Sequence, residues 1–145
     1  MDMLKSRSFT TVIFSAFCFK NIFRPYNCQG PSMEPTLNNK REDDIVLVEK
    51  LSTMLGILRV GDIVVVIDHD EPYSRVCKRI KAMEGDTVYN SKTQKYVKVR
   101  PGHVYVVGDN EEISYDSNSY GDIPMGLVVG RVYFRCWPLN EITFF

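Results

Sequence analysis

The sequence predicts a mostly β domain behind a short N-terminal apolar segment. Its 145 residues are about the length of one domain, and 44% hydrophobic with 25% charged residues is a globular composition, not a disordered one. Val, Ile, Tyr, Phe and Thr, which strands favour, are plentiful. Short apolar runs are joined by connections of hairpin length.

Charge and composition exclude several classes of function. Eighteen basic residues balance eighteen acidic ones, so no overall charge indicates a nucleic-acid partner. The two histidines, His69 and His103, limit any metal centre or Ser-His-Asp triad. The cysteines lack C-x-x-C spacing, so neither a zinc site nor a redox motif is indicated. We interpret all four as free thiols: Cys18, Cys28, Cys77 and Cys136.

The N-terminal segment contains an apolar run over residues 9–19, flanked by basic residues. This run is shorter than the roughly 20 residues that cross a bilayer, unless Lys20 snorkels and residues 21–23 extend it. A membrane anchor, a signal-peptide core and a helix of the protein core are the three alternatives. The absence of a small-x-small cleavage pattern weighs against the signal peptide. We therefore predict an anchor over residues 1–27 and a β-rich domain over 28–145.

Hydrophobic patterning predicts the elements of that domain. Apolar positions 51, 54, 55 and 58 have helical spacing over about two turns. The continuous apolar run 63–67 is typical of a strand buried on both faces. Strands are expected at 45–48, 63–67, 73–81, 87–90, 96–99, 103–107 and 127–137, the last broken at Gly130.

The octapeptide Gly-Pro-Ser-Met-Glu-Pro-Thr-Leu, residues 30–37, places one serine between two prolines. Pro31 fixes its own φ, and Pro35 pushes Glu34 towards an extended backbone. Ser32 is therefore expected on a stiff, non-helical loop. It is either a turn residue or a nucleophile, depending on whether the chain supplies a base.

The predicted strand 73–81 contains a cation on its apolar face. Side chains alternate along a strand, so the mostly charged odd positions 75–81 form the solvated face. Lys78 then points inward between Val76 and Ile80. Lysine is rarely buried without a partner or a purpose. It either snorkels, pairs with a carboxylate, or serves chemistry.

Ser32 and Lys78 together make a catalytic dyad feasible. A serine hydroxyl needs a base to remove its proton, and a neutral lysine is such a base. Desolvation lowers the lysine pKa from about 10.4. A value of about 8 would cost roughly 3 kcal/mol. The polar loop 111–120 offers hydroxyls that could orient the amine, including those of Ser114 and Ser119.

Three motifs resemble the conserved boxes of type I signal peptidases. Residues 30–36 resemble the serine box, and Arg-Val-Cys-Lys-Arg-Ile at 75–80 with Glu-Gly-Asp at 84–86 resembles the lysine box. Gly-Asp-Asn at 108–110, followed by Ser114, Asp116, Ser119, Tyr120 and Gly121, resembles the third box. The short chain and the Val-Cys-Lys-Arg form are most similar to mitochondrial inner-membrane members of the family.

This resemblance implies a fold of two antiparallel β-sheets and a protease that uses neither metal nor cofactor. It implies that Ser32 is the nucleophile and that Lys78 is the general base. Ser114 would orient the lysine, and Asp109 and Asp116 would brace the site. The substrate would be a precursor presequence held as an added strand by residues 28–32 and 75–78, including Gly30, Pro31, Val76 and Cys77.

The same resemblance implies location and partners. The enzyme would sit in the mitochondrial inner membrane with its catalytic domain facing the intermembrane space, paired with a second, homologous peptidase subunit. No nucleic acid is implied. Within the same resemblance, a non-catalytic supporting subunit is the alternative function. Self-cleaving repressors share Ser-Lys chemistry, but this chain shows no helix-turn-helix segment.

Three positions depart from the family pattern. Gly30 stands where bacterial members often have a serine that supplies a second oxyanion donor. Residues 82–86 read Ala-Met-Glu-Gly-Asp, where many members have Gly-x-Pro-Gly-Asp. Asn118 stands where the family usually has an arginine that pairs with the aspartate matching Asp116, so that ion pair is absent here.

Overall fold

The computed structural model describes residues 21–39 and 43–145 of the chain. Its elements are mostly strands, joined by short turns. The strands are β1 (Phe23–Cys28), β2 (Asp44–Glu49), β3 (Ile63–Ile67), β4 (Arg75–Ala82), β5 (Thr87–Asn90), β6 (Lys95–Lys98), β7 (His103–Val107), β8 (Ile123–Pro124), β9 (Val128–Trp137) and β10 (Thr143–Phe144). The helical turns are η1 (Pro31–Met33), α2 (Leu51–Met54), α3 (Ser117–Tyr120), η2 (Met125–Leu127) and η3 (Leu139–Glu141).

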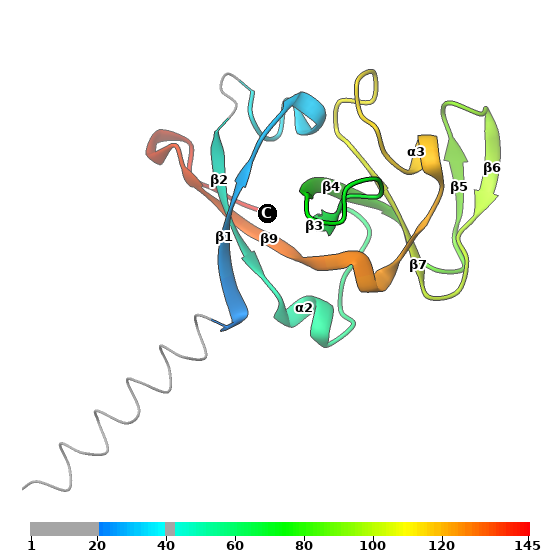
Figure 1. Ribbon diagram of the computed structural model, residues 1–145, viewed down its shortest axis with the longest axis horizontal. Coiled ribbons are helices and arrows are strands. Elements are labelled where there is room, and N and C mark those ends of the chain that lie inside the picture. Colours follow the sequence, from blue (N-terminus) through cyan, green and yellow to red (C-terminus); the bar gives the residue numbers. More distant parts are fainter. Residues whose placement is uncertain (1–20, 40–42) are drawn as a thin grey trace, which may run out of the picture.

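The strands form a large antiparallel sheet and a small hairpin. The large sheet has the order β1-β2-β9-β3-β4-β7-β8, with β10 added to β9. The hairpin pairs β5 with β6 and lies beyond β7, away from β1 and β2 (Figure 1). The predicted mostly β, antiparallel fold class is therefore confirmed.

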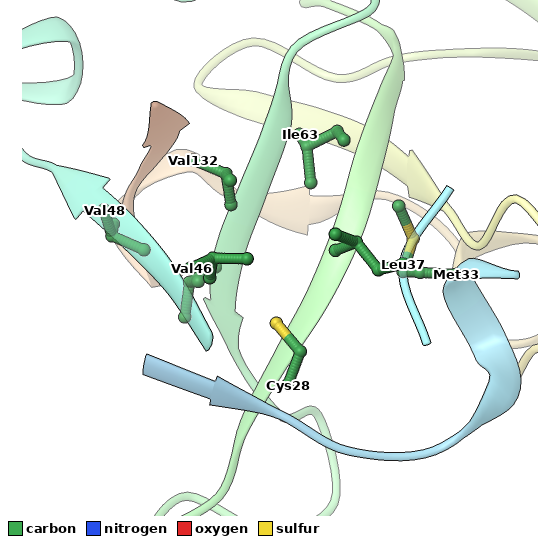
Figure 2. Close-up of a cluster of buried hydrophobic side chains, with 8 residues drawn as sticks. Cys28, Met33, Leu37, Val46, Val48, Ile63 and Val132 are labelled. Carbon is green, nitrogen blue, oxygen red and sulfur yellow. The ribbon is translucent and has the colours of Figure 1, made fainter. Parts of the chain in front are cut away.

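β3 is the centre of the large sheet because both of its faces are apolar. Ile63 and Val65 pack in one core cluster, whereas Val64 and Val66 pack in another. Figure 2 shows the first cluster, in which side chains from β1, the loop after it, β2, β3 and β9 converge. β4 hydrogen-bonds to β3 along residues 75–79 and therefore starts at this core.

The N-terminal boundary lies earlier than the sequence indicated. β1 pairs with β2 from Phe23 to Cys28, so residues 23–27 belong to the sheet and not to the anchor range 1–27. Such a short edge strand, rich in Arg, Pro and Asn, has no periodicity that identifies it. The apolar run 9–19 lies outside the described residues. Within those residues, no helix has the length and hydropathy to span a bilayer.

Two other predictions need correction. The helix α2 is one turn long, ending at Met54, because Gly56 has a positive φ of 63° and closes the turn. β9 runs through Gly130 without a break. A Cβ at Gly130 would lie 2.6 Å from the Glu49 carbonyl oxygen, so the glycine allows close approach of β2. The register with β3 shifts beside it, as at a bulge.

Candidate functional site

Ser32 lies in η1, directly after β1. This is a single 3-10 turn and not the non-helical loop expected from the two prolines; Pro31 starts it because the first turn needs no donor there. Met33, the last residue of the turn, and Leu37, which follows it, are buried in the first core cluster and anchor the turn on its C-terminal side. Ser32 itself remains partly exposed at a surface pocket. The turn thus presents the hydroxyl from a fixed backbone.

Asn38 fixes the segment that leads into the serine. Its side-chain amide donates to the carbonyl oxygens of Cys28, at 3.1 Å, and Gly30, at 2.9 Å. Asn38 is only 2% exposed, and its backbone N–H donates to the Asp44 carboxylate at 2.9 Å. One buried residue therefore links the end of β1, the segment before the serine turn, and β2. Nothing in the sequence motif marked this residue.

Lys78 lies on the inward face of β4, as the strand alternation predicted. It is 3% exposed, and its neighbours Val76 and Ile80 pack in the second core cluster. Its Nζ donates to the Ser114 Oγ at 3.2 Å. Within the described residues it makes no salt bridge. Neither the snorkelling nor the ion-paired alternative therefore applies.

The electrostatics of Lys78 favour its neutral form. Burial lowers the pKa of the Lys78 amine, because desolvation penalises the charged form. The negative charge of Asp116 acts in the opposite direction and is the smaller effect. The net result is a pKa below the ordinary lysine value of 10.5. A lowered pKa is what a lysine needs to act as a base near neutral pH.

Gly108 brings the serine turn and the third box together. A Cβ built there would collide with both the Ser32 carbonyl oxygen and the Ser114 Oγ. Asn110, two residues further on, donates from its backbone N–H to that same Ser32 carbonyl at 3.1 Å. The Ser32 backbone and the Ser114 hydroxyl, which accepts from Lys78, therefore both lie against Gly108. Close backbone approach explains a glycine here without any need for a positive φ.

Asp109 joins three motifs through an ion pair. Its carboxylate accepts from Arg79 Nε at 2.8 Å and Nη2 at 2.7 Å, and from the Thr36 hydroxyl at 2.5 Å. Burial raises the pKa of Asp109, but the hydrogen bonds from Arg79 and Thr36 outweigh it and hold the pKa below the usual value. Arg79 was expected on a solvated face. Its partnership with Asp109 cannot be seen in the strand pattern alone.

The Asp116 carboxylate is bound by backbone amides, since Asn118 stands at the position where an arginine was expected as its partner. Its carboxylate accepts from the Gly108 N–H and the Asn118 N–H, both at 2.9 Å. The second bond caps α3. The Asn118 side chain in turn accepts from the buried Tyr105 hydroxyl at 3.0 Å. The Asp116 carboxylate therefore has uncharged donors in place of an ion-pair partner, and Asn118 extends this network to Tyr105.

A pocket beside Ser32 is walled by the two predicted substrate segments. Its lining includes Gly30, Val76 and Cys77 from the predicted binding set, whereas Pro31 is exposed and outside it. The remaining lining comes from the end of β1, the start of β4, and Gln29, Ser32, Met33, Asn38 and Val65.

Lys92 is a further cation near the site that the sequence did not single out. Its Nζ donates to the Ser114 carbonyl oxygen at 3.2 Å and to the Ser119 hydroxyl at 2.6 Å. The contact fixes the loop that carries Ser114. Among the described residues, no group of three or more His, Cys, Asp or Glu side chains is placed to hold a metal ion.

Comparison with known proteins identifies the family of the chain. The family described as "Signal peptidase, peptidase S26" matches residues 2–98 and 89–137. The mitochondrial inner membrane protease subunit 1 of Homo sapiens is 42% identical over 121 residues, covering 81% of this chain and 71% of the human protein.

Two further relatives are similar over comparable or longer ranges. Subunit 1 of Schizosaccharomyces pombe is 42% identical over 120 residues, covering 81% of this chain and 75% of its own. The Arabidopsis thaliana ATP-independent inner membrane protease subunit 1b is 32% identical over 151 residues, covering 97% and 86%. The chain therefore belongs to the S26 family of signal peptidases.

Proposed function

We propose that this chain is a membrane-bound serine endopeptidase whose Ser32 and Lys78 form a catalytic dyad. The observation that carries the proposal is Lys78: a buried amine without an ion-pair partner among the described residues, hydrogen-bonded to Ser114. Its substrates are sorting presequences of precursor proteins delivered to the mitochondrial intermembrane space. The relatives named as mitochondrial inner membrane proteases support this substrate class and location.

The chemistry follows from the two protonation states of Lys78. The neutral amine takes the proton of the Ser32 hydroxyl as Oγ attacks the scissile carbonyl. Because Nζ donates to Ser114, its lone pair is free for that proton. The resulting ammonium then protonates the leaving amine, and an acyl-enzyme remains. A water, deprotonated by Lys78 in the same way, hydrolyses the ester.

The backbone N–H of Ser32 supplies one donor to the developing oxyanion. Gly30 has no hydroxyl to serve as a second one. Asp109 acts on the geometry of the site through Arg79, and Asp116 acts through the Gly108 amide. Neither carboxylate takes the proton, although the charge of Asp116 raises the pKa of Lys78 against the larger effect of burial. Ser114 positions the lysine.

An extended substrate has room along β4. β7 pairs with β4 at Arg79, Ile80 and Ala82, so among the described strands residues 75–78 are paired only with β3. A peptide can add at this free edge by main-chain hydrogen bonds, with side chains entering the pocket between β4 and residues 28–32. A peptide added as a strand in this way would have its scissile bond beside Ser32.

A cleavage assay on a presequence-containing precursor, with the full chain purified in detergent, tests the dyad. Ser32→Ala and Lys78→Met are expected to abolish cleavage. Lys81→Met, on the same strand but facing Glu111 at the surface, is the matched control and should cleave normally. Normal activity in either dyad variant would contradict the proposal.

Membrane attachment and pairing are tested separately. The intact protein is expected to stay in the pellet on alkaline carbonate treatment and to co-purify with a homologous second subunit. An inert wild-type chain that restores activity to such a partner would instead establish the supporting-subunit function.

A further inference from the structure

Two thiols that lie far apart in the sequence meet at the wall of the pocket beside Ser32. Cys28 ends β1 and Cys77 lies in β4, directly before Lys78. Cys77 packs against the core cluster that contains Cys28, and both line the same pocket. Figure 2 shows the Cys28 side chain pointing from β1 into that cluster.

The pair is asymmetric in its access to solvent. Cys28 is 5% exposed, whereas Cys77 is partly exposed on the pocket wall. Contact with the Cys77 thiol and burial both raise the pKa of Cys28. A reagent from solution therefore meets Cys77 first, because a thiolate that solvent can reach reacts faster. Cys136 has a different environment, donating to the Ile45 carbonyl at 3.2 Å.

We propose that Cys28 and Cys77 are a thiol–disulfide exchange site that reacts with a small disulfide such as oxidised glutathione, and that the disulfide they form switches the peptidase off. The second half of this proposal rests on the proposed function. The first half concerns the chemistry of the thiols alone.

The exchange takes two balanced steps. The Cys77 thiolate attacks one sulfur of the small disulfide, forming a mixed disulfide and releasing one small thiol after proton uptake. Cys28, which lines the same pocket, then loses its proton and attacks the Cys77 sulfur. This forms the Cys28–Cys77 bond and releases the second small thiol. The protein loses two hydrogens and two electrons, and the small disulfide gains them.

The bond would alter the site because it joins the two substrate-holding segments. A disulfide holds its sulfurs about 2.05 Å apart, well inside the non-bonded contact of two thiols. Forming it draws residue 28 and residue 77 together across the pocket that a substrate side chain would enter. Cys77 is also adjacent to Lys78, so the shift reaches the general base. Reduction restores the open pocket.

The test uses the full-length chain in detergent, equilibrated in buffers of defined reduced-to-oxidised glutathione ratio. Free thiols are then alkylated, and cross-linked peptides are mapped by mass spectrometry. Oxidised protein is expected to contain a Cys28–Cys77 cross-link, with Cys136 still alkylated. Cys28→Ala is expected to accumulate glutathione on Cys77 instead. The proposed exchange site would be disproved if Cys28 and Cys77 were both still alkylated, and therefore still free thiols, in folded wild-type protein from the oxidising buffer.

Cleavage of the precursor, measured on the same samples, tests the switch. Oxidation is expected to slow cleavage more than tenfold, with recovery on reduction, in both wild type and Cys136→Ser. A mapped cross-link that leaves the rate unchanged would refute the switch. Reduced wild type that cleaves nothing would count against the proposed peptidase function, while the mapped cross-link would still establish the exchange site.

Discussion

The Nζ of Lys78 lies 3.2 Å from the Oγ of Ser114, although 36 residues separate them in the sequence. This contact fixes the direction of the amine on a strand whose other inward side chains are apolar. Ser114→Ala should therefore leave the lysine buried but misdirected. A hydrogen bond to a charged group is worth about 1.5–3 kcal/mol, so kcat/KM is expected to fall about tenfold to a hundredfold.

The control for Ser114→Ala is Ser117→Ala, in the same loop. The Ser117 hydroxyl accepts from the Val106 N–H at 3.0 Å and does not contact Lys78. Ser117→Ala should lower stability and keep most of the activity per folded molecule. Equal losses of kcat/KM in the two variants would show that Ser114 acts on the fold alone.

Burial of Lys78 makes stability depend on pH in a defined direction. Its pKa is lowered in the folded protein, so the unfolded chain binds the extra proton between the folded value and 10.5. The free energy of unfolding therefore rises with pH across that window. Lys78→Met should be more stable than wild type at neutral pH, by about 1.4 kcal/mol for each unit of the shift.

The Lys78→Met advantage should shrink as pH approaches the ordinary lysine pKa, because the wild-type penalty vanishes there. Urea unfolding across this range measures it, with Lys81→Met as the surface control. A pH-independent difference between Lys78→Met and wild type would mean that the folded and unfolded pKa values of Lys78 do not differ.

Gly108→Ala is a steric test of the contact between the serine turn and the third box. A Cβ there meets the Ser32 carbonyl oxygen and the Ser114 Oγ together, so Gly108→Ala must displace the serine turn or the third box. Overpacking of this kind costs about 1–3 kcal/mol, and cleavage should fall more than tenfold. Gly126→Ala is the control, since a Cβ there meets nothing within 4 Å. Unchanged cleavage by Gly108→Ala would rule out this junction as a requirement.

The sequence predicted the core of the fold because its apolar runs are unambiguous. The run at 63–67 is buried on both faces, as its continuous apolar pattern predicted. Lys78 lies inward, as the alternation along its strand predicted. β1 escaped prediction because an edge strand of Arg, Pro and Asn is stabilised by pairing with β2 and not by its own pattern. The predicted strand break at Gly130 was wrong because, in a sequence, a glycine that permits close packing cannot be told from one that ends a strand.

The supporting contacts of the site join segments that are far apart in the chain, so no local sequence pattern predicts them. Asn38 and the partnership of Arg79 with Asp109 bridge segments 8 to 30 residues apart. Thr36 meets Asp109 across 73 residues. The role of Asn118 was likewise hidden, because replacing an ion pair by backbone amides leaves no charge to recognise.

Asp109→Asn tests whether the ion pair with Arg79 serves the site or only the fold. The partly buried hydrogen bonds to Asp109 predict a loss of about 1–3 kcal/mol. The loss should disappear as pH falls through the lowered pKa of Asp109, where wild type is itself protonated. Asp122→Asn breaks a comparable pair with Arg100 away from the site. If both variants kept full cleavage when folded, Asp109 would be structural only.

Substitutions at Asn38 should change substrate binding without changing proton transfer. Asn38→Gly removes the donors to the Cys28 and Gly30 carbonyls yet suits the positive φ of 60° at this position. Ser32 stays anchored by Met33 and Leu37, and Lys78 is untouched. KM for a presequence peptide should rise about tenfold, equivalent to about 1.4 kcal/mol, with kcat changed far less. Asn38→Ala should show the same KM and a lower stability, because alanine is strained at that φ. A fall in kcat at constant KM would place Asn38 with the chemistry and not with the segment that holds the substrate.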